Sequence, residues 1–326
     1  MQPAASLRWL LLISVVMLWG SSFALLKIAV VTIPPVWVMA LRLVIAGAAL
    51  SGLLLVLGGR FSAGLRLWTG FLAIAVIGNV VPFLLITWGV KYIPSGLSGI
   101  LMAVMPLGVA LLAHFFLPDE PLTWRKVLGL FFGFSGVVIL LGPQRLLGLA
   151  PQGLPFWGQM AMIAGALCYS VQSILTRRMQ AAGAMESAAA ALSLGGLIGL
   201  ALALAIDPAG MAGASSASLT ALGLIGVLTT ALATVAYFRL IRLAGAGFAS
   251  MINYLIPVFA LFVGWLFLDE RLNPSALAGL ALILAGLFIV QSQRPALPPA
   301  IRPLSPEPSR SPPPRGAPHA RRRLPP

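Results

Sequence analysis

Polar side chains are rare within the long apolar runs of this chain, so each one is a candidate for chemistry. Arg42 lies about two helical turns inside an apolar run that follows Pro34 and Pro35. An unpaired arginine in the middle of a bilayer costs at least ~2.5–3.5 kcal/mol, so the side chain must face protein groups or a wet cavity. Two roles stay open for it: a counter-charge for an anionic group of a ligand, or a structural hydrogen-bond hub.

Aromatic, hydroxyl and amide side chains recur at similar places in the two halves of the chain. Trp19 and Ser22 lie in the first apolar run, and Tyr169 and Gln172 lie in the sixth. This combination suits a small amphipathic solute, although packing and hydrogen bonding between helices would use the same residues. The further candidates for contact with a ligand are Asn79, Met102, Asn253 and Tyr254.

Three prolines inside apolar runs, Pro82, Pro106 and Pro257, are predicted to kink their helices. Proline lacks the backbone N–H and frees the carbonyl about one turn before it. Asn79 lies three residues before Pro82, and Asn253 and Tyr254 lie four and three residues before Pro257. We expect paired kinks at the wall of a cavity, with kink geometry that serves no ligand as the alternative.

The composition decides which kind of solvent these segments face. The chain has 326 residues, of which 60% are hydrophobic and 9% are charged, whereas soluble domains average ~25% charged residues. A helix crosses the ~30 Å hydrocarbon layer with ~20 apolar residues, and the runs here are apolar on every face rather than alternating as in barrel strands. We therefore predict an all-α membrane protein with about ten transmembrane helices.

The predicted spans follow from the lengths of the apolar runs. They cover Trp9–Val30, Val36–Leu57, Leu67–Val90, Gly96–Leu117, Val127–Leu141, Leu154–Leu175, Ser187–Ile206, Leu219–Leu240, Phe248–Leu268 and Ser275–Gln291. Most of the 21 lysines and arginines then lie on one side of the membrane if the N-terminus is inside. Because basic residues favour the cytoplasmic side, we expect both termini to be cytoplasmic.

The end of the first half resembles the end of the second half. The aligned residues are Lys91 and Arg242, Gly96 and Gly247, Pro106 and Pro257, Asp119-Glu120 and Asp269-Glu270, Gly129 and Gly279, and Gly136 and Gly286. Two halves with five helices each would insert in opposite orientations, which is the construction of many transporters with a site near the midplane. We predict two inverted five-helix repeats over 8–141 and 154–291, an inter-repeat loop over 142–153, and a disordered Pro/Arg-rich cytoplasmic tail over 292–326.

Enzyme chemistry finds little support in the sequence. The acidic pairs Asp119-Glu120 and Asp269-Glu270 lie at helix ends, where we expect turn and cap roles. Cys168 is the single cysteine, and no nucleophile triad, zinc motif or G-x-x-x-x-G-K-[ST] loop occurs. We therefore expect no catalytic residues, no metal, no cofactor and no enzyme activity. Much of the net charge of +14 comes from the tail, and no nucleic-acid motif accompanies it.

Several stretches of the sequence resemble a known family, the EamA-domain family of the drug/metabolite transporter superfamily. The matching pieces are L-W-G-S-S-F-A-L-L-K from Leu18, A-L-R-L-V-I-A-G from Ala40, P-V-F-A-L-F-V-G-W-L-F-L-D-E-R-L from Pro257, and the glycines Gly279 and Gly286. The resemblance covers about Arg8 to Val290. It implies two five-helix domains and a bacterial-type inner-membrane carrier for small metabolites, often an exporter of amino acids or their relatives. Trp19, Ser22 and Arg42 match recurrent positions of the family.

The leading hypothesis is a secondary transporter, not driven by ATP, that exports amino acids or related solutes by alternating access. Its cavity would be lined by the first, third, fourth, sixth, eighth and ninth spans. The expected partners are a small-molecule metabolite and membrane lipid, with no nucleic acid, and the sequence leaves a homodimer open. The alternative is a membrane-embedded enzyme that acts on a lipid-linked substrate. The expected location is a bacterial-type inner membrane, crossed many times.

Overall fold

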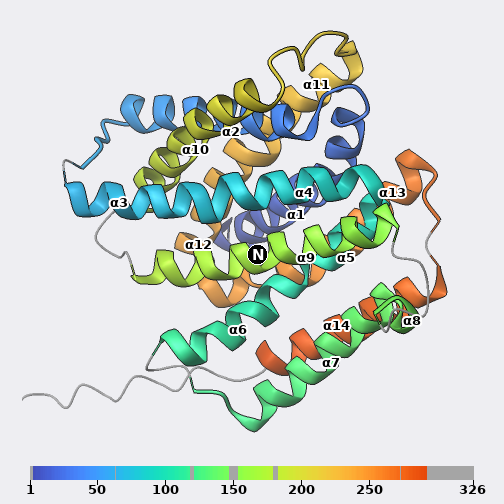
Figure 1. The fold of residues 1–326 in the computed structure, drawn as a ribbon. Helices are drawn as coiled ribbons and strands as arrows, with labels where there is room; N and C mark the ends of the chain where they lie inside the picture. The colour runs from blue at the N-terminus through green and yellow to red at the C-terminus, as the bar shows by residue number, and fades with distance from the viewer. Residues whose placement is uncertain are drawn as a thin grey trace, which may run out of the picture. The chain divides into compact units, whose positions relative to one another are not determined.

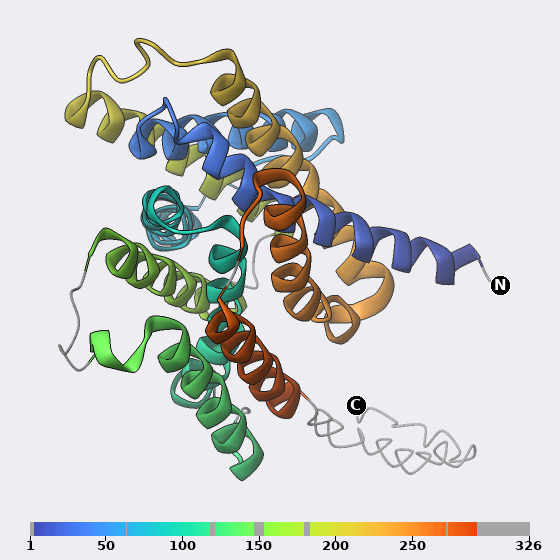
Figure 2. The same cartoon turned by 90° about the vertical axis from the view of Figure 1, so that its right-hand side faces the viewer.

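The computed structural model describes residues 3–62, 64–117, 121–146, 153–178, 183–271 and 273–291, and these are all helical or loop (Figures 1 and 2). The helices before the 147–152 gap are α1 (Pro3–Ala29), α2 (Pro35–Val56), α3 (Leu65–Ala73), η1 (Ile74–Val80), α4 (Val81–Tyr92), α5 (Ser95–Met102), α6 (Val104–Phe116), α7 (Trp124–Leu141) and the short α8 (Pro143–Leu146). Those after it are α9 (Leu154–Arg178), α10 (Ala184–Ile206), α11 (Ser216–Leu224), η2 (Ile225–Leu232), α12 (Ala233–Ala249), α13 (Ile252–Leu268) and α14 (Pro274–Gln291).

The predicted all-helical membrane architecture is confirmed. Among the described residues, 9 continuous helices are long and apolar enough to cross a membrane, and Ile252–Leu268 is a shorter apolar helix. The third span comprises α3, η1 and α4, and the eighth comprises α11, η2 and most of α12. Large apolar side chains such as Phe131, Trp265 and Phe288 remain exposed on the outer surface, as expected for residues that face lipid.

The structure modifies two predicted spans. The fourth runs over Ser95–Phe116, close to its predicted bounds, with a local break at Ala103 between α5 and α6. Pro106 has no N–H for the carbonyl of Met102, which removes the bond that would continue the helix. The ninth span begins at Ile252 instead of Phe248, because Gly245 adopts a φ of 79° and the chain then turns before α13.

Glycines allow the closest helix contacts. A β-carbon added to Gly47 of α2 would lie 2.8 Å from the backbone nitrogen of Ser193 in α10. One added to Gly129 of α7 would lie 2.6 Å from the carbonyl oxygen of Gly286 in α14. Small residues therefore let these helix backbones touch, as in other membrane bundles. Figure 1 shows the two pairs, α2 with α10 and α7 with α14, on opposite sides of the bundle.

Two π-helical segments interrupt the third and eighth spans. In η1, the Asn79 side-chain nitrogen donates to the carbonyl of Ile74 at 3.4 Å. In η2, the Thr230 hydroxyl donates to the carbonyl of Ile225 at 2.9 Å. Each bond reaches five residues back, so a polar side chain satisfies a carbonyl in a widened turn. The matching pair supports the predicted repeat, while the inverted orientation of the halves stays a prediction.

Candidate functional site

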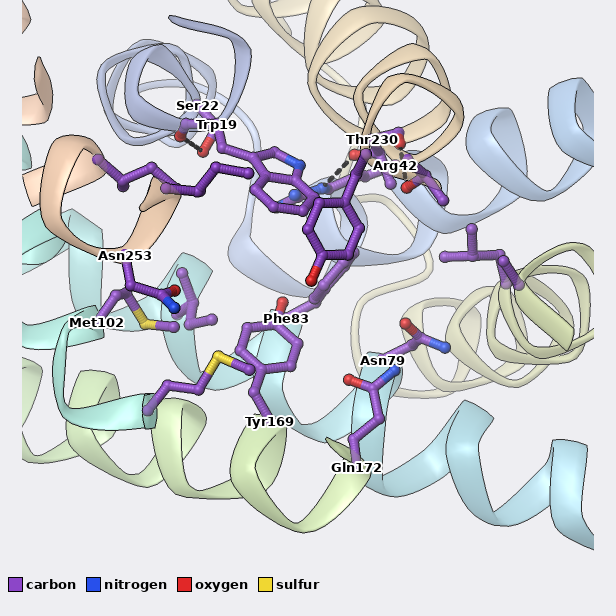
Figure 3. Close-up of a pocket in the computed structure, with 18 of the residues that line it drawn as sticks. Trp19, Ser22, Arg42, Asn79, Phe83, Met102, Tyr169, Gln172, Thr230 and Asn253 are labelled. Carbon is purple, nitrogen blue, oxygen red and sulfur yellow. Dashed lines mark hydrogen bonds between the residues drawn. The ribbon is translucent and has the colours of Figure 1, made fainter. Parts of the chain in front are cut away.

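A cavity of about 520 Å³ lies inside the bundle (Figure 3). Its walls come from α1, α2, η1, α4, α5, α6, α9, α10, η2, α12 and α13. The first, third, fourth, sixth, eighth and ninth spans were expected to line it, and α2 and α10 add to them. Most lining residues are apolar or aromatic, and this size and character are typical of sites for small organic molecules.

Most of the residues singled out in the sequence meet at this cavity. Its walls include Trp19, Ser22, Arg42, Asn79, Met102, Tyr169, Gln172 and Asn253 (Figure 3). Tyr254 is not part of the wall, although its neighbour Asn253 is, because successive helical residues point about 100° apart. Of the three prolines, Pro257 lines the cavity, and Pro82 and Pro106 do not.

Arg42 is the charged side chain among the described lining residues, and it is only 8% exposed. Its Nε donates to the hydroxyl oxygen of Thr230 at 2.9 Å. The carbon of its guanidinium lies 4.0 Å from the centre of the Phe83 ring. Phe83 in turn contacts the ring of Tyr169 edge-on, with centroids 6.1 Å apart. One N–H and one face of the guanidinium are therefore held by the protein.

The other polar wall residues are partly occupied by their own surroundings. Ser22 donates its hydroxyl proton to the carbonyl of Trp19 at 2.6 Å, so toward the cavity it can act as an acceptor. Gly78 makes room for Gln172, because an added β-carbon would lie 2.6 Å from the Cγ of that side chain and would collide with its Cδ. The wall thus combines one cation with hydroxyl and amide groups that orient a ligand without carrying charge.

Two charged side chains link helices at one end of the bundle, beside the cavity; we call this the tied end. Lys27 of α1 donates to the carbonyls of Val90, Lys91 and Ile93 at 2.9, 3.2 and 2.8 Å, at the end of α4. These carbonyls carry the negative end of the helix dipole, so a lysine is favoured there.

Glu270, at the end of α13, binds the start of α5. It accepts hydrogen bonds from the backbone N–H groups of Ser95 at 2.6 Å and Gly96 at 3.0 Å, and from the Ser95 hydroxyl at 2.9 Å. Gly264 leaves space for the carboxylate, since a β-carbon there would collide with it. The cap role expected for the second acidic pair is confirmed for Glu270. Asp119 and Glu120 lie outside the described residues.

The opposite end of the cavity is bounded by residues that reach the surface. Thr176 near the end of α9 and Ala184 at the start of α10 line the cavity and are exposed. At the tied end, the lining residues Leu26, Ile86 and Gly99 are buried. The cavity therefore extends toward the side that the basic residues predict to be cytoplasmic.

Several wall residues had no place among the candidates from the sequence. Phe83, Thr230, Thr234, Tyr237 and Phe238 all line the cavity. Thr230 holds in η2 the place that Asn79 holds in η1, so an alignment of the third span with the eighth would have found it. The aromatic residues have no such signal, because apolar side chains are common in every span.

The described part of the chain has no group of three or more His, Cys, Asp and Glu side chains that could hold a metal ion. Cys168 is half-buried. No described residue of the cavity wall is acidic, and Arg42 stands among apolar, hydroxyl and amide side chains.

Comparison with known proteins also points to a transporter. The EamA-like transporter family matches residues 7–142 and 156–292. The uncharacterized transporter YoaV of Bacillus subtilis is 25% identical over 279 residues, covering 85% of this chain and 94% of that protein. The uncharacterized inner membrane transporter YedA of Escherichia coli is 25% identical over 292 residues, covering 86% and 89%. A probable terminal-alkyne amino-acid exporter of Streptantibioticus cattleyicolor is 29% identical over 209 residues, covering 63% and 67%.

A solved crystal structure of a protein with 19% sequence identity shares the fold. It superposes with a TM-score of 0.62 and covers 87% of this chain and 96% of the other. The family match spans both halves of the membrane region and the relatives are named as transporters. The resemblance noted from the sequence is thereby confirmed, and this chain is a multi-pass membrane protein that belongs to the EamA-like transporter family.

Proposed function

We propose that the protein is a secondary transporter that exports small metabolites with a carboxylate group, amino acids or close relatives of them. The observation that carries this proposal is the guanidinium of Arg42 at the wall of a cavity in which no described lining residue is acidic. A buried arginine without a carboxylate partner is costly in a bilayer, and an anionic group of a ligand would offset that cost.

The rest of the cavity supports an amphipathic solute. Aromatic and methionine side chains provide an apolar surface, while Asn79, Gln172 and Asn253 provide amide groups that hydrogen-bond in either direction. The relative from Streptantibioticus cattleyicolor is named as an amino-acid exporter, which agrees with this class of cargo.

Alternating access would expose the cavity to each side of the membrane in turn. The lining residues are buried at the end where Lys27 and Glu270 bind helix ends, and they are exposed at the opposite end. This difference supports a state that is open on the predicted cytoplasmic side, which is the side from which an exporter loads. We place the protein in a bacterial-type inner membrane with both termini cytoplasmic. Tags at both termini should be inaccessible from outside intact cells, and an accessible C-terminal tag would contradict this topology.

The test is flux of radiolabelled amino acids in proteoliposomes, with and without a proton gradient. We expect uptake above that of protein-free liposomes, and dependence on the gradient would show whether protons drive it. If no amino acid or related small carboxylate moves while the protein turns over a lipid-linked substrate, the transporter proposal is wrong and the enzyme alternative holds.

A further inference from the structure

Thr230 and Phe83 hold the Arg42 guanidinium in one orientation. The Thr230 hydroxyl donates its single proton to the carbonyl of Ile225 at 2.9 Å, so its lone pairs remain for the Nε–H of Arg42, also at 2.9 Å. The Phe83 ring covers one face of the guanidinium at 4.0 Å, within the range of a cation–π contact.

This arrangement leaves one edge of the guanidinium for a ligand. An arginine has five N–H donors, and its Nε–H is the one used by Thr230. The four N–H groups on the two terminal nitrogens make no hydrogen bond to the described residues, and Arg42 lines the cavity. Two parallel N–H bonds from such an edge match the two oxygens of a carboxylate in geometry and charge.

We propose that Thr230 and Phe83 are positioning residues that fix this edge, so that the cavity selects a planar carboxylate over the uncharged amide of the same carbon skeleton. This inference rests on the proposed function and adds to it the group by which the substrate is recognised. A guanidinium that is already fixed loses less conformational freedom when a ligand binds than a mobile one does. The resulting gain in affinity is largest for ligands that bind both terminal nitrogens.

The same π segment provides a matched control. Thr229 is also buried and donates to the carbonyl of Ile225, at 3.1 Å, but it does not line the cavity. Thr229→Val therefore removes a hydroxyl from that carbonyl without touching Arg42. Thr230→Val removes the bond to Arg42 as well, and Thr230→Ser keeps it. Comparison of the three separates the Arg42 contact from the shape of η2.

The experiment is calorimetric titration of the purified full chain in detergent with two probes, 4-methylpentanoate and 4-methylpentanamide. We expect the native chain to bind the carboxylate at least about tenfold more tightly than the amide. Thr230→Val should reduce this preference about tenfold, chiefly by weakening the carboxylate. Phe83→Leu should lower the preference less, and Thr229→Val and Thr230→Ser should leave it within about twofold.

Two results would overturn the inference. One is equal binding of acid and amide by the native chain, and the other is an equal loss for both probes in Thr230→Val, which would mark a purely structural hydroxyl. Neither result touches the flux assay, so a chain that moves amino acids but ignores the difference between acid and amide would remain a transporter. Failure of the native chain to move any small carboxylate would instead remove the proposed function.

Discussion

Arg42 and Lys27 are both cations within membrane-spanning helices, but the protein treats them differently. Lys27 places its ammonium on three carbonyls at the end of α4, and Glu270 places its carboxylate on the start of α5 across the same turn. Both charges are therefore stabilised by backbone groups at helix ends. Arg42 makes one hydrogen bond to the described residues, to Thr230, and it lines the cavity. The comparison separates charges that hold helices together from a charge that remains available to a ligand.

The largest expected effect comes from Arg42→Ala. We expect flux of a carboxylate substrate to fall at least about 100-fold, because two charge-assisted hydrogen bonds to the ligand are lost. The thermal midpoint in detergent should change little, since removal of a cation that lacks a carboxylate partner also removes its desolvation cost.

Arg42→Lys is the control for this prediction, because it keeps the charge and loses the planar arrangement of donors. Its flux should lie between those of the native chain and Arg42→Ala. If Arg42→Ala lowers the yield of folded protein as much as it lowers flux, then Arg42 is a structural hub like Lys27 and the comparison fails.

A smaller effect, on stability, is expected for Glu270→Gln. The amide keeps one acceptor oxygen, but its NH₂ group faces donors at the start of α5, so the free energy of unfolding should fall by about 2 kcal/mol. Thermal unfolding in detergent measures this change. The matched control is Asp269→Asn, which removes the same charge from an exposed neighbour whose left-handed φ of 50° suits asparagine. Equal effects of the two variants would show that net charge, and not the cap on α5, is responsible.

The smallest effect is expected for Lys27→Met. Methionine keeps much of the apolar stem but withdraws the ammonium from the α4 carbonyls, which should cost about 1 kcal/mol of stability. Lys91→Met, at an exposed position near the same helix end, should cost less. Unchanged binding of a carboxylate ligand in Lys27→Met, measured by calorimetry, would sharpen the contrast with Arg42, whereas a loss like that of Arg42→Ala would contradict it.

Much of the candidate site could be predicted because polar groups are expensive in lipid. Arg42, Asn79 and Gln172 stood out in apolar runs, and the structure places all three at the cavity. Prediction failed where the direction of a side chain around its helix decides whether it lines the cavity, as for Tyr254. It also failed for Phe83 and Tyr237, because an aromatic side chain has little desolvation cost in lipid. Such a residue therefore does not stand out in an apolar run.

The helical breaks were only partly predictable. Pro106 indicated a disturbance in the fourth span, and the structure has one at Ala103 between α5 and α6. No proline accompanies η2, whose widened turn contains the hydroxyls of Thr229 and Thr230 bound to one carbonyl. Such local bonds compete with the regular ladder, and threonine also occurs in many regular helices, so its type alone does not indicate a π segment.

The sequence by itself determined the membrane class, the approximate spans and the family, because apolar length and charge content are summed along the chain and need no partner. Tertiary structure decided which charge is bound by backbone groups and which faces the cavity, since this depends on what packs against Lys27, Glu270 and Arg42. Residues far apart in the chain supply those surroundings: Val90 and Ile93 for Lys27, and Thr230 for Arg42. Their meeting depends on how the helices pack, which apolar length does not encode.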